Sequence, residues 1–554
     1  MQILASKEIW ERARAGWERL SEGQCLAEGD ENYGAFLDAN GVPIPGHVGT
    51  ALLVAGLVFE GVVREDFVEA RCARIGAALR WFEESALNEN GRISSPDCNP
   101  DSGPDTAFVV QLWCGLLDGV GRSGEVSGAW AELIGLMHKL LRRMLQGLPG
   151  AGFHTPNHRW VMATALAWGF RETGDAALRR ELDLYLAEGP DGDAEGFYPE
   201  RSAGVYDAVS NRAFQLLHRW AGWAEGLGDV RRNLELINRL LNSDGTVDTV
   251  LSTRQDANAA VVPDCLLDVL LRAHRAGGEP VESDALKTLF ATIWEAAPEL
   301  SVSAALWLAW EVRCSAPVEC PALAGAVDGE WFVRSKSVWR ARCAGWSFRA
   351  MAGHAYPLVL RSPVGEEFRM ALAHAYMGTG AFRGDRFLER SGTAWALRHE
   401  ARGVAFRPGY EMPLGIRVEA ENYEARRSDR PLRAFAPAAS VLSWKWTRTG
   451  SELCWASEYE APGVYAQWVV DVPAGMFFEI GGAASRVAPG EVRFFGDGAS
   501  VAWSGEGWRL ECGSGCVAHR MHPMRDALAP PPDGGRFVIA LRTPFTHRLT
   551  LRFR

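Results

Sequence analysis

Apolar residues recur at three- and four-residue spacing through most of the first 317 positions, which predicts α-helices. The stretches between them carry Gly, Pro, Asp and Asn, as turns do. The N-terminal segment MQILASKEIWERARAGWERL mixes charged and apolar residues as an amphipathic helix does. The further predicted helices cover residues 48–63, 66–86, 105–120, 126–147, 158–173, 176–187, 204–224, 229–241, 258–276 and 283–312.

Long polar loops alternate with short ones between these predicted helices. The long loops cover residues 21–46, 88–105 and 188–204, and loops of that length are unusual in a compact domain unless they are functional. About ten to twelve helices in antiparallel pairs predict a bundle, a solenoid or an incomplete α/α toroid, with one end of a ring elaborated into a cleft. No clean repeat of 30 to 50 residues is visible, which disfavours the solenoid.

After about Ala324 the pattern changes to an alternation of apolar and polar residues with a period of two, which predicts antiparallel strands. A sandwich or layered sheets is favoured over a barrel. The boundary is predicted near residues 315–328. The predicted fold class is therefore α+β and multidomain, with an incomplete α/α toroid over residues 1–318 and an antiparallel β-sandwich over 325–554. The strand-like segments include SVWRARCAGWSFRAMAG, SVLSWKWTRT, ELCWASEYEA, VYAQWVVDVP, RFVIALRT and HRLTLRFR.

Composition and charge exclude some classes of partner. The chain is 47% hydrophobic and 23% charged, which is ordinary for a globular protein, and 554 residues exceed one compact core. A net charge of −11 argues against a nucleic-acid binder, although a local group of arginines could hold an anionic substrate. No run of 18 apolar residues is present, which argues against a membrane span.

The 11 cysteines are odd in number and scattered, which is not typical of a disulfide framework. Reduced thiols and a cytoplasmic location are expected, since no signal peptide is visible. Cys512 and Cys516 form the closest pair, and without a second pair at matching spacing they are weak evidence for a metal.

The segment GFHTPNHRW, residues 152–160, precedes a strongly apolar helical stretch. Thr155 is predicted to be the N-cap and Pro156 the first helical residue. Asn157 and His158 would then lie in the first turn and face the helix mouth, where an anionic group binds readily. The helix dipole would disfavour protonated His158 and leave it neutral, able to act as a base. The alternative is an ordinary capped helix whose polar first turn is solvated.

Two polar segments further along the chain are candidate partners for this helix start. The first covers residues 193–207, and its Tyr206 lies 49 residues after Asn157, about one helical hairpin further on. In a toroid that spacing would return Tyr206 to the same rim, although Tyr198 and Tyr206 could instead pack beneath the loop. The second is the cluster at residues 252–256, for which a loop pinned by its own hydrogen bonds is an equal alternative to substrate contact.

Several of these motifs together resemble the heparinase II/III-like polysaccharide lyases. They are TPNHRW, the D-x-x-G-x-Y-x-E-R-S-x-x-V-Y pattern at 193–206, N-R at 211–212, R-R-N-L at 231–234, D-G at 244–245 and S-x-R-Q-D at 252–256. The resemblance implies an α/α toroid with an antiparallel β-sheet domain. It also implies β-elimination on an anionic, uronic-acid-containing polysaccharide of glycosaminoglycan type. Related lyases can hold a divalent ion in the β domain, but no tight His/Asp cluster calls for one here, and no cofactor is expected to be required.

The resemblance also implies roles for particular residues. β-Elimination needs a neutralised carboxylate, a base for the C5 proton and an acid for the leaving oxygen. Asn157 with a nearby arginine is suited to the first task. Tyr206 could perform both proton transfers on one face, or His158 could be the base and Tyr206 the acid on opposite faces. The predicted substrate-binding residues are Arg159, Arg201, Arg212, Arg254 and Glu200, and the β domain would add His354, or else Tyr356 or Tyr410.

Two other functions stay open at this point. A glycoside hydrolase on an α/α toroid would need two carboxylic acids across the cleft. Its candidates are Asp97, Asp101, Asp105, Asp193 and Glu200. A non-catalytic carbohydrate-binding protein would need neither these nor the proton-transfer groups. The particular polysaccharide, endo or exo cleavage and the oligomeric state are not determined by the sequence.

Overall fold

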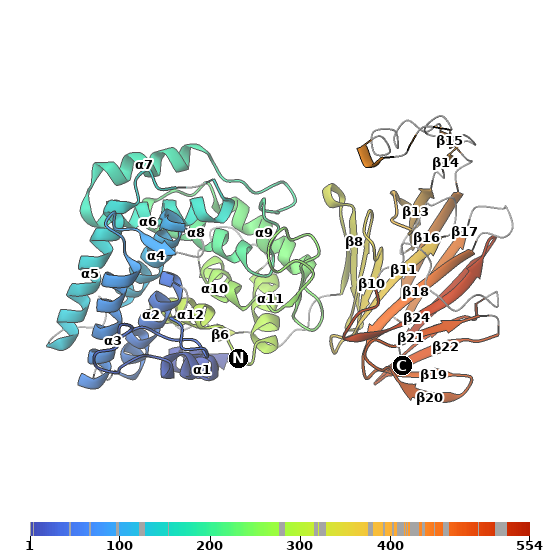
Figure 1. The fold of residues 1–554 in the computed structure, drawn as a ribbon, viewed down its shortest axis with the longest axis horizontal. Helices are drawn as coiled ribbons and strands as arrows, with labels where there is room; N and C mark the ends of the chain where they lie inside the picture. The colour runs from blue at the N-terminus through green and yellow to red at the C-terminus, as the bar shows by residue number, and fades with distance from the viewer. Residues whose placement is uncertain are drawn as a thin grey trace. The chain divides into compact units, whose positions relative to one another are not determined.

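The computed structural model describes two compact units, Met1–Ala326 and Val327–Arg554, coloured blue to green and yellow to red in Figure 1. Helices come first and strands second, which confirms the predicted α+β class. The described residues are 2–3, 5–43, 46–65, 68–95, 99–120, 128–152, 154–275, 283–314, 319–320, 328–374, 381–391, 394–401, 404–406, 415, 417, 419–421, 432–434, 438–447, 449–457, 465–496, 498–515 and 529–553.

The first unit is built from helical hairpins. None of its described helices has the length and hydrophobicity needed to traverse a lipid bilayer. The helices are α1 (Ser6–Glu22), α2 (Gly46–Arg64), α3 (Glu69–Trp81), α4 (Gly103–Val120), α5 (Ala129–Gly147), α6 (Pro156–Thr173), α7 (Ala176–Ala187), α8 (Tyr206–Ala221), α9 (Leu227–Leu240), α10 (Leu267–Arg275), α11 (Ser283–Ala296) and α12 (Val302–Cys314). Short pieces join them: η1 (Phe82–Ala86), η2 (Asp264–Leu266), β1 (Gln2–Ile3), β2 (Ile93–Ser95), β3 (Asn99–Ser102), β4 (Val247–Asp248), β5 (Ala260–Val261) and β6 (Glu319–Cys320).

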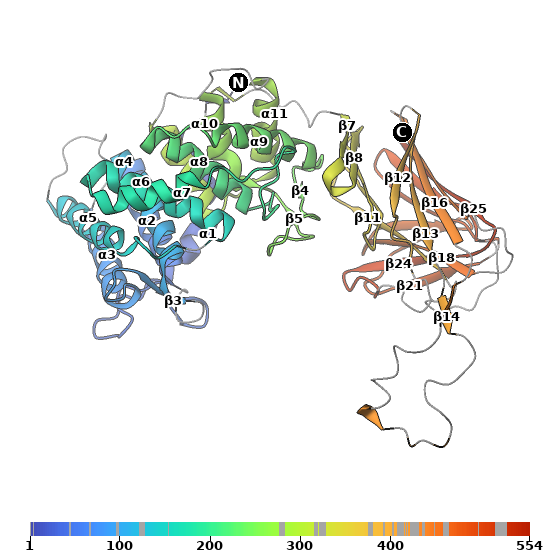
Figure 2. The same ribbon diagram turned by 90° about the horizontal axis from the view of Figure 1, so that it is seen from above.

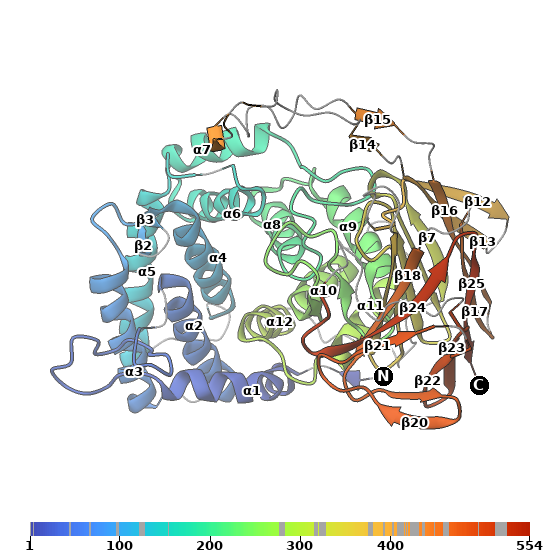
Figure 3. The same ribbon diagram turned by 45° about the vertical axis from the view of Figure 1, so that its right-hand side comes forward.

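The even-numbered helices contact one another in a closed series. α2 packs on α4, α4 on α6, α6 on α8, α8 on α10, α10 on α12, and α12 returns to α2. Figure 3 shows α2, α4, α6 and α8 following one another inside the unit, with α3, α5 and α7 outside them. α1 contacts both α12 and α2. The start and the end of the helical sequence therefore meet.

One turn geometry recurs at four returns from an outer to an inner helix. In each, the N–H of an Asp or Asn donates to the carbonyl four residues later, and the N–H of a glycine three residues later donates back. The glycine φ angles lie between +75° and +97°, where only glycine is relaxed. The turns begin at Asp38, Asn88, Asp193 and Asn242, with glycines Gly41, Gly91, Gly196 and Gly245.

Asp38 and Asn88 are 50 residues apart, and Asn242 follows Asp193 by 49. The helical unit therefore does contain a repeat of about one hairpin. The apolar pattern did not reveal it because the repeated signal is a short polar turn.

Two predicted helices differ from the observed ones, and proline explains both. Residues 283–312 form two helices, α11 and α12, separated around Pro298. Residues 258–276 are helical only from η2 onward, because β5 pairs with β4 before Pro263. Proline lacks an N–H and steers the preceding residue away from helical geometry.

The second unit contains two large sheets, whose strands can be followed in Figure 2. Their orders are β21-β24-β18-β11-β10-β9-β8-β7 and β12-β13-β16-β17-β25-β23-β22-β19-β20. Neighbouring strands are antiparallel except for the parallel pair β21 and β24. The strands are β7 (Gly329–Val333), β8 (Val338–Cys343), β9 (Trp346–Met351), β10 (Leu358–Arg361), β11 (Glu367–His374), β12 (Arg386–Ser391), β13 (Ala394–Ala401), β14 (Val404–Phe406), β15 (Leu432–Ala434), β16 (Ala438–Thr447), β17 (Gly450–Ser457), β18 (Tyr465–Pro473), β19 (Phe477–Ile480), β20 (Ala483–Arg486), β21 (Val492–Phe495), β22 (Val501–Gly505), β23 (Trp508–Cys512), β24 (Gly534–Arg542) and β25 (Thr546–Phe553).

Both sheets contribute to one buried core rich in tryptophan. Trp455 of β17 and Trp468 of β18 meet edge to face with ring centroids 5.0 Å apart. Trp339 of β8 and Trp444 of β16 lie 5.1 Å apart. The alternating apolar residues of the two sheets thus face each other, and many of the 22 tryptophans are core residues rather than sugar-binding surface.

Candidate functional site

The first turn of α6 begins where the sequence predicts it. Pro156 is the first helical residue and Thr155 occupies the N-cap position, but the Thr155 side chain makes no capping hydrogen bond. Glu200 fills the helix mouth instead. Its Oε2 accepts hydrogen bonds from the Asn157 backbone N at 3.3 Å and from Asn157 Nδ2 at 2.6 Å.

Asn157 is completely buried and Glu200 is 5% exposed. The anion predicted at this helix terminus is therefore present, but it is the protein's own carboxylate. The Asn157 amide thus faces the helix mouth and donates to Glu200 there, and its role toward a substrate carboxylate stays a prediction.

Glu200 also connects α6 to the two other predicted segments. Its Oε1 lies 3.3 Å from Arg254 Nε as an ion pair, without the alignment of a hydrogen bond. The Arg254 guanidinium carbon lies 4.9 Å from the centroid of the Tyr206 ring. The Tyr206 hydroxyl donates to Gln255 Oε1 at 3.2 Å. Asn157, Glu200, Arg254 and Tyr206 therefore form one continuous cluster, which we call the α6–α8 cluster together with His158.

The loop that carries Arg254 is tied to the loop that carries Glu200. The Glu200 carbonyl accepts from both the N–H and the hydroxyl of Thr253, each at 3.1 Å. Asp256 accepts from the Gly204 N–H at 3.2 Å and from the Ser252 hydroxyl. These bonds fix the spacing between segments 193–207 and 252–256.

His158 is half-buried, and its ring meets the edge of Phe108 at 5.8 Å. Burial lowers its pKa below the usual value, Arg254 adds to this, and Glu200 and Asp105 oppose it. With its pKa below the usual value the imidazole is mainly uncharged at pH 7, and burial is the largest cause. Among the described residues, its ring nitrogens have no side-chain hydrogen-bond partner.

A buried chain of polar side chains links segment 193–207 to α8 and α9, and the sequence did not single it out. The Tyr198 hydroxyl donates to Asn211 Oδ1, and Asn211 Nδ2 donates to Asn233 Oδ1, both at 2.7 Å. Asn233 Nδ2 then donates to the Gly196 carbonyl and to Asp207 Oδ2, both at 2.9 Å. Tyr198 thus packs beneath its loop. The N-R and R-R-N-L motifs were the available signal for this chain.

Asp207 follows Tyr206 and is 1% exposed. Burial raises its pKa to about 7, the charges of Asp256 and Glu200 add to the rise, and the hydrogen bond from Asn233 opposes it.

The five predicted substrate-binding residues fall into different groups. Arg212 donates two hydrogen bonds to buried Asp268 at 2.8 and 2.7 Å and a third to the Cys265 carbonyl. These contacts join α8 to α10 and engage the guanidinium inside the protein, and its role in substrate binding stays a prediction. Arg159 is likewise ion-paired, with Glu188 and Asp191.

Arg201 remains available. It is partly exposed, adopts a left-handed φ of 52°, and its side chain has no recorded partner among the described residues. Such a backbone conformation is costly for a residue with a Cβ and is found preferentially at functional sites.

The carboxylates proposed for a hydrolase are mostly occupied in holding loops. Asp101 pairs with Arg92 at 2.7 Å, and Asp193 Oδ1 accepts two backbone N–H groups of its own turn. Asp105 begins α4 and contributes to the field at His158. Asp97 lies outside the described residues.

The predicted β-domain residues belong to the second unit. His354 Nδ1 contacts the backbone of Tyr356 at 3.0 and 3.1 Å. The Tyr356 hydroxyl donates to Asp471 at 2.6 Å, and Arg536 pairs with the same carboxylate. Tyr356 is therefore held in a structural triad, and a catalytic role for His354 stays a prediction. Tyr410 and Cys516 lie outside the described residues, within which no group of three metal-binding side chains occurs.

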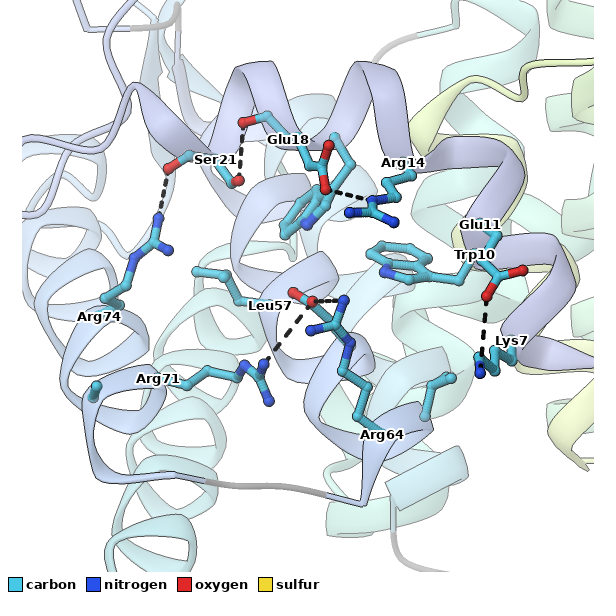
Figure 4. Close-up of a pocket in the computed structure, with 14 residues that line it drawn as sticks. Lys7, Trp10, Glu11, Arg14, Glu18, Ser21, Leu57, Arg64, Arg71 and Arg74 are labelled. Carbon is cyan, nitrogen blue, oxygen red and sulfur yellow. Dashed lines mark hydrogen bonds and ion pairs between the residues drawn. The ribbon is translucent and has the colours of Figure 1, made fainter.

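A separate pocket of about 720 Å³ lies between α1, α2 and α3 (Figure 4). Its basic side chains face acidic ones: Lys7 faces Glu11, Arg14 faces Glu18, and Arg64 and Arg71 share Glu60. It contains none of the predicted site residues, so the α6–α8 cluster remains the candidate site.

No protein-family model and no curated protein matches the chain, but solved structures do. A Paenibacillus xanthan lyase aligns with a TM-score of 0.55 at 10% identity, covering 99% of this chain and 57% of that one. A mutant of the Streptomyces coelicolor A3 chondroitin AC lyase aligns with a TM-score of 0.50 at 11% identity, covering 99% and 79%.

The chain therefore spans a little over half the length of the xanthan lyase. An unsaturated glucuronyl hydrolase aligns with 57% of this chain at a TM-score of 0.39, which is too weak to indicate a shared function. At these identities the likeness shows the fold alone. The fold is shared with these two polysaccharide lyases.

Proposed function

We propose that this protein is a polysaccharide lyase that cleaves a uronic-acid-containing polysaccharide by β-elimination. We further propose that it is of the heparinase II/III-like type, with an incomplete α/α toroid followed by an antiparallel β-sandwich. The observation that carries the proposal is the α6–α8 cluster, in which the Arg254 guanidinium lies over the Tyr206 ring and pairs with Glu200, whose carboxylate binds the first turn of α6 that carries His158. The lyase fold supports it.

In the proposed reaction a base removes the proton from C5 of the uronate. The electron pair forms the C4–C5 double bond, the bond from C4 to the bridging oxygen breaks, and an acid protonates that oxygen. We assign both transfers to Tyr206, because its partly exposed side chain carries a transferable hydroxyl proton and lies beside the Arg254 cation. His158 is the alternative base for elimination across opposite faces, since it is uncharged and has a free ring nitrogen.

The substrate carboxylate must be neutralised before C5 can lose its proton. Because the Asn157 amide is held by Glu200 and Arg254 pairs with the same carboxylate, we assign this task to Arg201. Asn157 then acts as a positioning residue: it fixes Glu200, and Glu200 fixes Arg254.

Replacing Tyr206 by Phe tests the assignment directly. The variant keeps the ring and its contact with Arg254 but loses the transferable proton, so kcat should fall by about 100-fold or more while substrate binding is nearly unchanged. Turnover is followed by the near-ultraviolet absorbance of the new double bond on a panel of uronic-acid polysaccharides. Tyr33→Phe, at an exposed tyrosine of a different loop, is the matched control. Parental turnover in Tyr206→Phe would overturn the assignment.

The same assay separates the lyase from its alternatives. A glycoside hydrolase using Asp105 and Glu200 would release reducing ends without the absorbance change. A non-catalytic binding protein would produce neither new reducing ends nor the absorbance change.

A further inference from the structure

The charges around the α6–α8 cluster restrict which uronic-acid polysaccharide fits. We define the site rim as residues 99–105, 154–160, 188–207 and 249–257, all of which the structure describes. The rim contains three arginines: Arg159, Arg201 and Arg254. Among its nine carboxyl residues, Glu200, Asp207 and Asp256 are buried, and Asp101 pairs with Arg92 outside the rim. The other five are Asp105, Glu188, Asp191, Asp193 and Glu195.

Two of the three rim arginines already have carboxylate partners. Arg159 is held between Glu188 and Asp191. Arg254 pairs with Glu200 and covers the Tyr206 ring. Within the rim only Arg201 has no recorded side-chain partner, so one full positive charge is open to a ligand.

A single open cation matches a single substrate anion. We propose that the sugars bound at this rim carry one carboxylate and no sulfate, so that the substrate is a non-sulfated uronic-acid polysaccharide recognised through Arg201. The proposal rests on the proposed lyase function and narrows its substrate class.

Sulfate groups would meet the excess of rim carboxylates. Like charges within one Debye length, about 10 Å at 0.1 M salt, repel one another, and a desolvated sulfate would find no second free cation in the rim. Sugar hydroxyls, by contrast, donate hydrogen bonds to carboxylates. The acidic rim therefore favours a hydroxyl-rich chain and disfavours a sulfated one.

The test measures binding by the full-length Tyr206→Phe variant, which retains the rim but does not turn over. The probes are matched pairs: chondroitin sulfate and chemically desulfated chondroitin, heparan sulfate and its desulfated, N-acetylated form, and alginate and chemically sulfated alginate. In the pairs that bind, the non-sulfated member should bind about tenfold more tightly or better. The difference should shrink as salt is added, because added salt screens the repulsion.

Two further variants and one control test which rim residues determine binding and the preference for the non-sulfated polymer. Arg201→Gln should weaken binding of the non-sulfated polymer by about 10- to 100-fold, whereas Arg180→Gln, which removes the same charge from an exposed position on α7, should not. Glu188→Gln should reduce the difference in affinity between the sulfated and non-sulfated members of each polymer pair. It removes one negative charge from the rim and one ion-pair partner of Arg159.

Equal or tighter binding of the sulfated members overturns the proposal, as does failure of every polymer to bind. Failure of the lyase proposal is seen separately. It would appear as the absence of unsaturated products from the parent enzyme on all six polymers, whichever members bind.

Discussion

Glu200 occupies the position that a foreign anion would take at the first turn of α6. Its carboxylate receives the Asn157 amide and faces Arg254 at the same time. A residue that fills a helix mouth in this way fixes the orientation of its neighbours without touching substrate, because both of its oxygens are engaged inside the protein.

Glu200→Gln should separate the two tasks of this residue. The glutamine can still accept the Asn157 hydrogen bond through its carbonyl, but it no longer holds Arg254 by charge. We expect kcat to fall by about tenfold or more, since Arg254 and the adjacent Tyr206 lose their fixed position, while uronate binding is retained or strengthened because one rim charge is gone. Steady-state kinetics and binding to a non-sulfated polymer measure the two effects. An unchanged kcat would show that Arg254 is positioned by other contacts.

Asp207 predicts a pH dependence of stability. Its pKa in the folded protein is about 7, above the ordinary value of 3.8, so the folded state holds the proton more tightly than the unfolded chain does. Its contribution is therefore fully present below about pH 4 and is lost as the pH rises through 7. Asp207→Asn cannot lose a proton. Relative to this variant, the parent should lose a few kcal/mol of unfolding free energy between about pH 5 and pH 8. Denaturant titrations at several pH values would reveal it, and parallel pH profiles would contradict it.

At the scale of residues, the sequence predicted which residues form the cluster, but not the hydrogen bonds and ion pairs among them. Asn157, Glu200, Tyr206 and Arg254 do converge, because the repeated hairpin returns the chain to the same end of the helices. The side-chain contacts of the candidate residues could not be predicted, because nothing in the sequence distinguishes Arg201 from Arg212. Only the fold shows that Arg212 lies opposite Asp268, whereas Arg201 has no acidic partner within the part of the chain that the structure describes. The commitment of the Asn157 amide to Glu200, 43 residues away, is equally a tertiary fact.

At the scale of elements, a buried ionic chain links three inner helices. Arg212 of α8 and Arg272 of α10 both pair with Asp268, and Arg272 also pairs with Glu311 of α12. Each charge is almost completely buried. Removing Asp268 therefore leaves Arg212 without its counter-charge and Arg272 with Glu311 alone, in a dry environment.

Asp268→Asn should consequently destabilise the helical unit by about 3–5 kcal/mol. Arg179 and Asp183 form an exposed pair on α7, and Asp183→Asn there should change stability by less than about 1 kcal/mol. Thermal unfolding of the two variants provides the comparison. Equal effects would show that the buried chain contributes no more than a surface pair.

The helices and strands themselves followed mainly from periodicity. Most predicted helices lie within a few residues of the observed ones, because apolar spacing reports directly which face is buried. The exceptions are local, at Pro263 and Pro298. Strands β10 to β13 were not predicted, because turns and charged residues interrupt their apolar pattern, although several of their side chains belong to the buried core.

At the scale of the whole molecule, the helical ring and the two-sheet unit have separate cores. A unit with its own apolar core is expected to fold alone. Residues 327–554 expressed separately should therefore give a cooperative unfolding transition and a strand-rich circular dichroism spectrum. Residues 1–326 should behave likewise with a helical spectrum. A fragment that stays unfolded, while the full chain is folded, would show that its stability depends on the other unit.

The four recurring turns have a consequence for how such a molecule can change over time. Each turn is closed by two hydrogen bonds of its own backbone and a glycine. In these four hairpins the chain therefore returns to the inner helix through local contacts. Insertions just beyond a turn, such as the long segment that ends at Tyr206, leave the helix pair and its packing undisturbed. Four of the hairpins thus share the same turn, and the segments that follow these turns differ in length and sequence. New specificities can then arise by exchanging a single end, while the stacked helices that carry it are inherited intact.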